Sequence, residues 1–191
     1  MPPKAKFTKE EVIAAALDVV RERGEQCLTA RELGARLNSS ARPIFTLFLG
    51  MDGVLCGVKR AARDLYNAHY IAEGLKEPLA FKGVGRAYLR FAQEENQLFR
   101  LLFMQKMQTP LESVLPALDE NYPLILTSIT NAYGVSEAQA EAIYSHLWVY
   151  THGIATLAVT GLCTFTQEKT DGMLTDVFTA LIARVKGEQP L

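Results

Sequence analysis

The sequence has few of the residues on which metal sites and covalent cross-links depend. Its 191 residues include three cysteines and three histidines, namely Cys27, Cys56, Cys163, His69, His146 and His152. The cysteines are odd in number and far apart, and none are spaced Cys-x-x-Cys, so they indicate neither a disulfide framework nor a zinc finger. The last two histidines are six residues apart, a poor spacing for one helical face. We therefore expect no metal, no cofactor and a reducing, cytoplasmic location.

Motifs of enzyme chemistry and patterns of β-structure are also missing. The chain contains no Gly-rich phosphate loop, no nucleophile elbow and no cluster of metal ligands, so we do not expect an enzyme. No internal repeat occurs, and no strand pattern is as long as the helical ones. Hydrophobic residues make up 49% of the chain, enough for a substantial core. The sequence predicts an all-α protein.

One long stretch has no charge at all. Between Ala142 and Gln167 there is no Asp, Glu, Lys or Arg, and this length would span a bilayer. Histidines, threonines and two glycines interrupt the stretch, however, and a helix that is apolar on all sides is also found buried inside soluble assemblies. The basic N-terminus leads into an amphipathic helix rather than a signal core. We predict that the chain is neither exported nor inserted in a membrane.

The net charge of −1 hides an uneven distribution along the chain. Residues 1–63 carry 11 lysines and arginines against 7 acidic residues, a net charge of +4. Residues 64–191 carry 9 against 14, a net charge of −5. The N-terminal part is therefore where we expect phosphate to bind.

Helix signals follow one another along the chain. Capping boxes begin at Thr8 and Ser136, and Gly134 is a helix-terminating glycine. Apolar spacing and caps together predict a helix over about 9–23, two short helices within 29–48, a long amphipathic helix from Val54 past His69, one opened by Pro78 and ending near Glu95, one capped by Asn96, one ending at Gly134, one over about 138–160, and a final helix through Leu174 and Val185.

The segment from Thr29 to Phe48 reads as a helix-turn-helix. Thr29 and Glu32 form the pattern of a capping box, and Leu33 and Leu37 lie four apart on one face. Asn38-Ser39-Ser40 supplies the turn, and Ser40 is the predicted N-cap of the second helix.

The second short helix has distinct inner and outer sides. Helical spacing buries three apolar residues, Ile44, Leu47 and Phe48. Arg42 and Thr46 then lie together on the outer side. A pinned inner side with a short polar or basic outer side is what a recognition helix in the DNA major groove requires.

This N-terminal pattern resembles that of TetR-family transcriptional regulators. The resemblance rests on three short helices, on Ser40-Ala-Arg-Pro-Ile-Phe-Thr-Leu-Phe48 and on Asp52-Gly-Val-Leu55. Three further stretches resemble the subgroup named for a Trp-His-Gly motif: Arg86-Ala-Tyr-Leu-Arg-Phe-Ala92, Leu98-Phe-Arg-Leu-Leu-Phe103 and Trp148-Val-Tyr-Thr-His-Gly153. The resemblance implies a DNA-binding domain over 1–53, a ligand-binding and dimerisation domain over 54–191, and a homodimeric repressor that a small effector releases from a palindromic double-stranded DNA operator.

Three sets of site residues follow from these patterns and from the resemblance. The expected DNA contacts are Thr29, Arg31, Ser39, Ser40, Ala41, Arg42, Phe45 and Thr46. The expected pocket for a small hydrophobic effector is lined by Phe99, Phe103, Met104, Met107, Tyr122, Trp148 and His152. The last two helices of each subunit are expected to form a four-helix dimer interface through Ile143, Leu147, Ile154, Ala158, Leu174, Phe178 and Leu181. For His152, a hydrogen-bonded core histidine is the preferred interpretation, and the ligand contact is its alternative.

Two positions depart from the family pattern. Phe45 stands where many members have tyrosine, and Met51 where many have lysine, and both of those residues usually touch phosphate. Since phosphate contacts supply much of the affinity for DNA, we expect weaker binding unless Lys4, Lys6 and Arg31 compensate. The alternative function is a helical small-molecule-binding or interaction module with weak or lost DNA binding.

Overall fold

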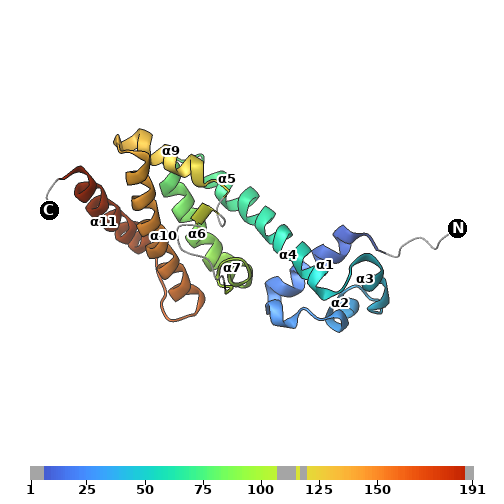
Figure 1. The fold of residues 1–191 in the computed structure, drawn as a ribbon. Coiled ribbons are helices and arrows are strands. Elements are labelled where there is room, and N and C mark those ends of the chain that lie inside the picture. The colour runs from blue at the N-terminus through green and yellow to red at the C-terminus, as the bar shows by residue number, and fades with distance from the viewer. Residues whose placement is uncertain (1–6, 107–114, 117–119, 188–191) are drawn as a thin grey trace. The chain divides into compact units, whose positions relative to one another are not determined.

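The computed structural model describes residues 7–106, 115–116 and 120–187, and these residues form helices and no strand (Figure 1). The all-α prediction is thus confirmed. The helices are α1 (Lys9–Arg23), α2 (Ala30–Arg36), α3 (Arg42–Leu47), α4 (Met51–Tyr66), α5 (Ala72–Gly74), α6 (Ala80–Glu94), α7 (Asn96–Phe103), α9 (Tyr122–Tyr133), α10 (Glu137–Val159) and α11 (Gln167–Lys186), with a 3-10 turn at Glu25–Cys27 and a π-helical turn at Asn67–Ile71. None of these described helices has the length and hydropathy needed to cross a bilayer.

Helix ends that depend on local signals lie where the sequence predicts them. Thr8 and Ser136 each form a complete capping box at the start of α1 and α10. Gly134 ends α9 in the left-handed conformation, with φ of 65°, which glycine adopts without steric cost.

Three predicted helix starts need correction. The fourth helix begins at Met51 rather than Val54, and α6 begins at Ala80 rather than Pro78. Asn96 is the first residue of α7 and not its cap. Glu95 holds the cap position instead, and its buried carboxylate accepts hydrogen bonds from the Arg21 guanidinium, with Nε at 2.7 Å from Oε2.

The described chain divides into two compact units. Unit 1 runs up to Asn67 and includes Glu95–Gln105, while unit 2 comprises Ala68–Glu94 and the chain from Lys106 onward. In unit 1, α1 packs on α4, α2 and α7 around fully buried side chains, among them Val12, Val20, Leu33, Val54, Val58 and Leu98. In unit 2, α10 packs on α6, α9 and α11, and the core includes Phe91, Ile125, Ile129 and Ile143.

Candidate functional site

The turn between α2 and α3 packs tightly against α2. The Ser39 N–H donates to the Gly34 carbonyl at 2.9 Å, and a Cβ at Gly34 would lie 2.9 Å from the Ser39 carbonyl oxygen. Asn38 takes the left-handed conformation, with φ of 48°, which asparagine tolerates better than most residues. Glycine at 34 therefore permits the close approach that aims the chain into α3.

Two predicted caps of this motif are different in the structure. Thr29 caps α2 by accepting from the Glu32 N–H at 3.2 Å, but the Glu32 carboxylate binds Arg23 at 2.7 Å and does not return to Thr29. Ser40 is not the N-cap of α3, because Ala41 holds that position with helical backbone angles and no side-chain hydrogen bond. Pro43 lies in the first turn and has no N–H, which removes one of the donors that a cap would satisfy.

The outer side of α3 is well separated from its inner side. Ile44 is fully buried and holds the helix to unit 1, with Leu47 and Phe48 half-buried beside it. Arg42 and Thr46 are exposed, as is the Phe45 ring. Leu49, just past the helix end, is also fully exposed, and sequence reasoning missed it because it lies outside the helical pattern.

The arginines of unit 1 fall into paired and unpaired groups. Arg21, Arg23 and Arg36 bind Glu95, Glu32 and Glu22, respectively. Arg31 and Arg42, by contrast, are exposed and form no ion pair within the described part of the chain. Lys4 and Lys6, the other expected phosphate ligands, lie outside the described residues. The two unpaired guanidinium groups of the motif are thus available to an anion.

An aromatic cluster joins α6 to α10 in unit 2. The Tyr88 hydroxyl lies 2.8 Å from Nδ1 of His152, and the His152 ring stacks on Trp148 with ring centres 5.0 Å apart and an interplanar angle of 3°. Burial lowers the pKa of His152. A neutral, half-buried imidazole between a phenol and an indole matches the hydrogen-bonded core histidine, and it also offers a polar atom to a ligand.

We expect His152 to make the stability of the protein depend on pH. Its pKa in the folded state lies below that of the unfolded chain, near 6.5, so the unfolded state binds more protons as the pH falls. The contribution is present above pH 6.5 and is lost as the pH falls through the folded-state pKa. Between pH 7.5 and 5.5, wild-type protein should lose more unfolding free energy in urea than His152→Gln does.

The matched control for this experiment is His69→Gln, which removes an exposed histidine in the same unit. It should keep the wild-type loss of stability at acid pH. Identical pH profiles for wild type and His152→Gln would show that His152 is not desolvated by the fold.

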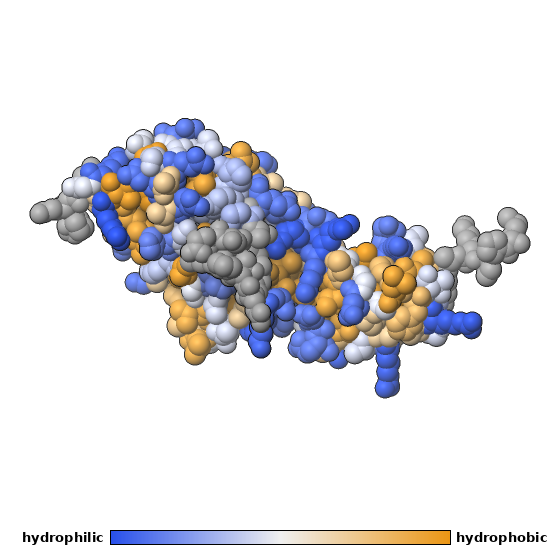
Figure 2. Space-filling model, viewed as in Figure 1, coloured by the Kyte–Doolittle hydropathy of each residue, from blue (hydrophilic) through white to orange (hydrophobic). Residues whose placement is uncertain are grey.

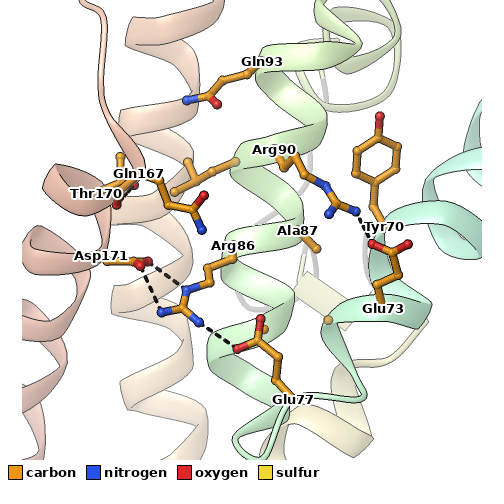
Figure 3. Close-up of a pocket in the computed structure, with 13 residues that line it drawn as sticks. Tyr70, Glu73, Glu77, Arg86, Ala87, Arg90, Gln93, Gln167, Thr170 and Asp171 are labelled. Carbon is orange, nitrogen blue, oxygen red and sulfur yellow. Dashed lines mark hydrogen bonds and ion pairs between the residues drawn. The ribbon is translucent and has the colours of Figure 1, made fainter.

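A polar cleft of about 220 Å³ lies where α5, α6 and α11 meet (Figure 3). The Arg86 guanidinium donates two hydrogen bonds of 2.9 Å to Asp171 and one of 2.9 Å to Glu77. Arg90, one turn beyond Arg86 on α6, donates a hydrogen bond of 2.6 Å to the Glu73 carboxylate. The bond to Asp171 raises the pKa of Arg86, so this residue stays charged and ties α11 to α6. These cations already have partners, and the cleft is an ion-pair network.

A second hollow of about 330 Å³ lies along α9, where Tyr122 and Leu126 line it. The Tyr122 hydroxyl donates to Oε1 of Glu141 at 2.9 Å. Burial, with this hydrogen bond as the second cause, raises the pKa of Tyr122 to about 12. Tyr122 therefore stays protonated at any physiological pH.

Within the described residues, no three His, Cys, Asp or Glu side chains gather to hold a metal ion.

Comparison with known families decides the identity of the chain. Residues 81–185, more than half of the chain, match the family described as the tetracyclin repressor-like C-terminal domain. The chain therefore belongs to the TetR family. TetR-family proteins are ligand-responsive transcriptional regulators and not enzymes, in line with the sequence prediction. The match does not identify the Trp-His-Gly subgroup, which stays a prediction.

Solved structures agree with the TetR fold. A transcriptional regulator from Rhodococcus sp. Rha1 is 18% identical with a TM-score of 0.63, and the match covers 93% of this chain and 97% of that one. A TetR variant from Acinetobacter baumannii AYE, solved in complex with minocycline, is 19% identical with a TM-score of 0.53, covering 95% and 96%. No curated protein matches the chain in sequence.

The effector residues expected for a TetR-family regulator fall in both units. Phe99 is fully buried in unit 1, where Phe103 packs edge-on against Tyr66 with ring centres 5.3 Å apart. Met104 is half-buried in the same unit. Tyr122, Trp148 and His152 belong to unit 2, and Met107 lies outside the described residues. The structure groups Trp148 and His152 with Tyr88, which the sequence patterns did not single out, and a pocket common to all seven residues stays a prediction.

The expected dimer residues of this TetR-family chain are not all on the surface. Ile143, Leu147 and Ile154 are at most 8% exposed, because they pack into the core of their own unit. Phe178 stacks on Phe81 with ring centres 4.8 Å apart. Ala158, Leu174 and Leu181 are half-buried.

The side of α10 that faces away from the core is a different stripe. Its exposed or half-exposed residues recur every three or four positions and are Ala142, His146, Val149, Gly153, Thr156, Leu157 and Thr160. None of them is charged, and Val149 is 50% exposed. Figure 2 shows hydrophobic residues at the end of α10, where the chain turns toward α11. We call these seven residues the α10 stripe.

Proposed function

We propose that this TetR-family regulator is a repressor that binds a palindromic DNA operator as a homodimer and leaves it when a small, mostly hydrophobic effector binds. The observation that carries the DNA-binding part is the outer side of α3. Arg42 is exposed there and unpaired among the described residues, on a helix whose inner side Ile44 pins to unit 1. A short helix held this way can enter the major groove without losing its anchor.

The charge pattern of unit 1 supports the same assignment. Arg31, at the start of α2, is exposed and likewise unpaired in the described chain, which supports a role in binding a phosphate beside the groove. Phe45 and Met51 lack the hydroxyl and the ammonium that other members use at these positions, which favours the alternative of a binding module with weak or lost DNA affinity. Arg31 offsets one lost phosphate contact, and therefore we prefer the repressor.

Dimerisation and operator symmetry belong together in this proposal. The α10 stripe is uncharged over about five turns, and an exposed helix face without charge is usually covered. A second copy, related by a two-fold axis, covers it with the same stripe. The same axis would set two α3 helices about 34–36 Å apart, as successive major grooves require.

The effector would act in unit 2. Trp148, His152 and Tyr88 combine apolar surface with a hydrogen-bonding imidazole, which suits a hydrophobic compound carrying one or two polar groups. Such a compound causes release only when it binds the DNA-free state more tightly than the DNA-bound state. Trp148 is the single tryptophan, so its emission can report on binding.

The proposal predicts that Arg42 and Arg36 differ in their effect on DNA binding. Duplexes are first selected from a random pool with wild-type protein, and Kd is then measured at fixed salt. Arg42→Ala should weaken binding to the selected duplex by about 1–3 kcal/mol without loss of helicity. Arg36→Ala removes the same charge from the same motif, but Arg36 is bound to Glu22 at 2.6 Å, and its loss should cost much less affinity.

The same assay separates the repressor from its alternative. A repressor yields a palindromic consensus, and an apolar compound that changes Trp148 emission lowers the affinity for it. If no duplex is enriched but apolar compounds still change Trp148 emission, the result would favour the ligand-binding module. Equal affinity of Arg42→Ala and wild type for the consensus would remove α3 as the recognition helix.

A further inference from the structure

Beside Arg42 and Thr46, the outer side of α3 exposes a large hydrophobic ring, which is unusual for a surface that is to meet the polar edges of bases. Phe45 is 51% exposed, and Leu49, four residues on, is fully exposed. The other exposed large hydrophobic side chains within the described residues are Leu124, Val149, Leu157 and Leu162, all in unit 2. Phe45 and Leu49 are thus the large apolar groups that unit 1 leaves open to solvent.

Thr46 adds to the apolar character of this surface. Its hydroxyl donates to the carbonyl oxygen of Arg42, one turn back, at 3.2 Å. The hydroxyl proton is therefore used within the helix and is not available to a base acceptor. Because Thr46 is exposed, its methyl group is open to a partner, and its hydroxyl oxygen can act toward that partner only as an acceptor.

The major groove of DNA contains one apolar group that such a surface can match. Guanine, adenine and cytosine present hydrogen-bond donors and acceptors there, whereas thymine adds its 5-methyl group. A phenyl ring cannot hydrogen-bond, so pressing it on a donor or acceptor would leave that group unsatisfied, at a cost in binding. Contact with a methyl group instead buries apolar surface on both sides.

We infer that Phe45 and the Thr46 methyl group read the 5-methyl groups of thymine, so that each operator half-site has thymine where it faces Phe45. The inference rests on the proposed function, since it requires that α3 enters the major groove. Within that function it gives Phe45 a role in specificity, at a position where many members carry a phosphate-binding tyrosine. Arg42, on the same side of α3, then supplies the charged contact to a guanine edge or a phosphate.

The test replaces each thymine of the selected duplex, one at a time, with deoxyuridine. This change removes the methyl group and keeps base pairing. At one or two positions of each half-site, uracil should raise the Kd of wild-type protein about fourfold, the effect expected for one buried methyl group. Phe45→Ala should bind the parent duplex more weakly and lose its sensitivity to uracil at those positions, as a double-mutant cycle requires for two groups in contact.

Leu124→Ala is the matched control, because it removes an exposed hydrophobic side chain of unit 2 and should keep the wild-type uracil profile. Suppose that the wild-type Kd is the same for every uracil-substituted duplex, although binding still depends on Arg42. That result would overturn the contact with thymine methyl groups and leave the proposed function intact. If Phe45→Ala keeps the wild-type uracil profile, or changes sedimentation instead, Phe45 contacts something other than thymine and the inference is wrong. If no duplex is selected at all, the proposed function itself fails, and this inference fails with it.

Discussion

Gly83→Ala is expected to lower the free energy of unfolding by about 3 kcal/mol, or to prevent unit 2 from folding. A Cβ at Gly83 would overlap the carbonyl oxygen of Gly74 and lie 2.8 Å from its carbonyl carbon. The reverse change has the same difficulty, since a Cβ at Gly74 would lie 2.6 Å from the Gly83 carbonyl carbon. The backbones of Gly74 and Gly83 are in direct contact, so neither can make room for a Cβ unless α5 and α6 separate.

The neighbouring glycine of the same helix gives the control for this prediction. A Cβ at Gly85 would meet nothing within 4 Å, so Gly85→Ala should be neutral or stabilise the helix by up to about 1 kcal/mol. Urea unfolding followed by circular dichroism measures both variants. A Gly83→Ala protein as stable as Gly85→Ala would mean that α5 and α6 do not approach this closely in solution.

The same approach shapes the polar cleft of unit 2. Glu77 follows α5, and Arg86 lies one turn beyond Gly83 on α6, so their 2.9 Å hydrogen bond depends on how near the two helices come. Gly83→Ala should therefore also loosen the tie from Arg86 to Asp171 on α11.

Structural features that depend only on residues close in sequence could be predicted. The helix caps show that such predictions fail where a residue from another helix competes. The capping boxes at Thr8 and Ser136 need partners three residues away, and both form as predicted. Glu32 has the same local pattern, but Arg23 of α1 competes for its carboxylate. Such competition depends on tertiary structure, which the local pattern does not contain.

The same limit applies to the candidate sites. Arg42, Phe45 and Thr46 could be predicted as exposed because one buried side of α3 fixes the other. On α10 both sides are apolar, so periodicity alone could not decide which side faces the core and which faces a partner. His152 was identified from the sequence, but its partner Tyr88 lies 64 residues away on another helix.

Val149→Glu is expected to dissociate the proposed homodimer, with a dimer Kd raised about 100-fold or more. The two-fold axis places two copies of the new carboxylate in the interface, and each would be buried without a partner. Val149 is 50% exposed in the single chain, so the substitution should leave the monomer folded. Sedimentation equilibrium at micromolar concentration measures the change, and circular dichroism checks the fold.

A substitution at Val149 tests the dimer interface without disturbing the fold, whereas a substitution at Phe178, one of the interface residues expected from the sequence, does not. Phe178→Glu would break ring contacts to Phe81 and Tyr133 inside unit 2, so it would destabilise the fold whether or not a dimer forms. Leu124→Glu makes the same kind of change at an exposed hydrophobic residue of α9 and should leave the dimer intact.

Loss of the dimer should appear in the DNA measurements as well. A monomer places one α3 in one groove, so Val149→Glu should bind the selected operator with far lower affinity than wild type. The number of phosphates neutralised falls by half, and the slope of log Kd against log salt should fall by about half with it. A Val149→Glu protein that stays dimeric would exclude the α10 stripe as the interface. A monomeric variant with the full wild-type salt slope would instead show that a single subunit makes all the phosphate contacts, so that dimerisation does not set the operator symmetry.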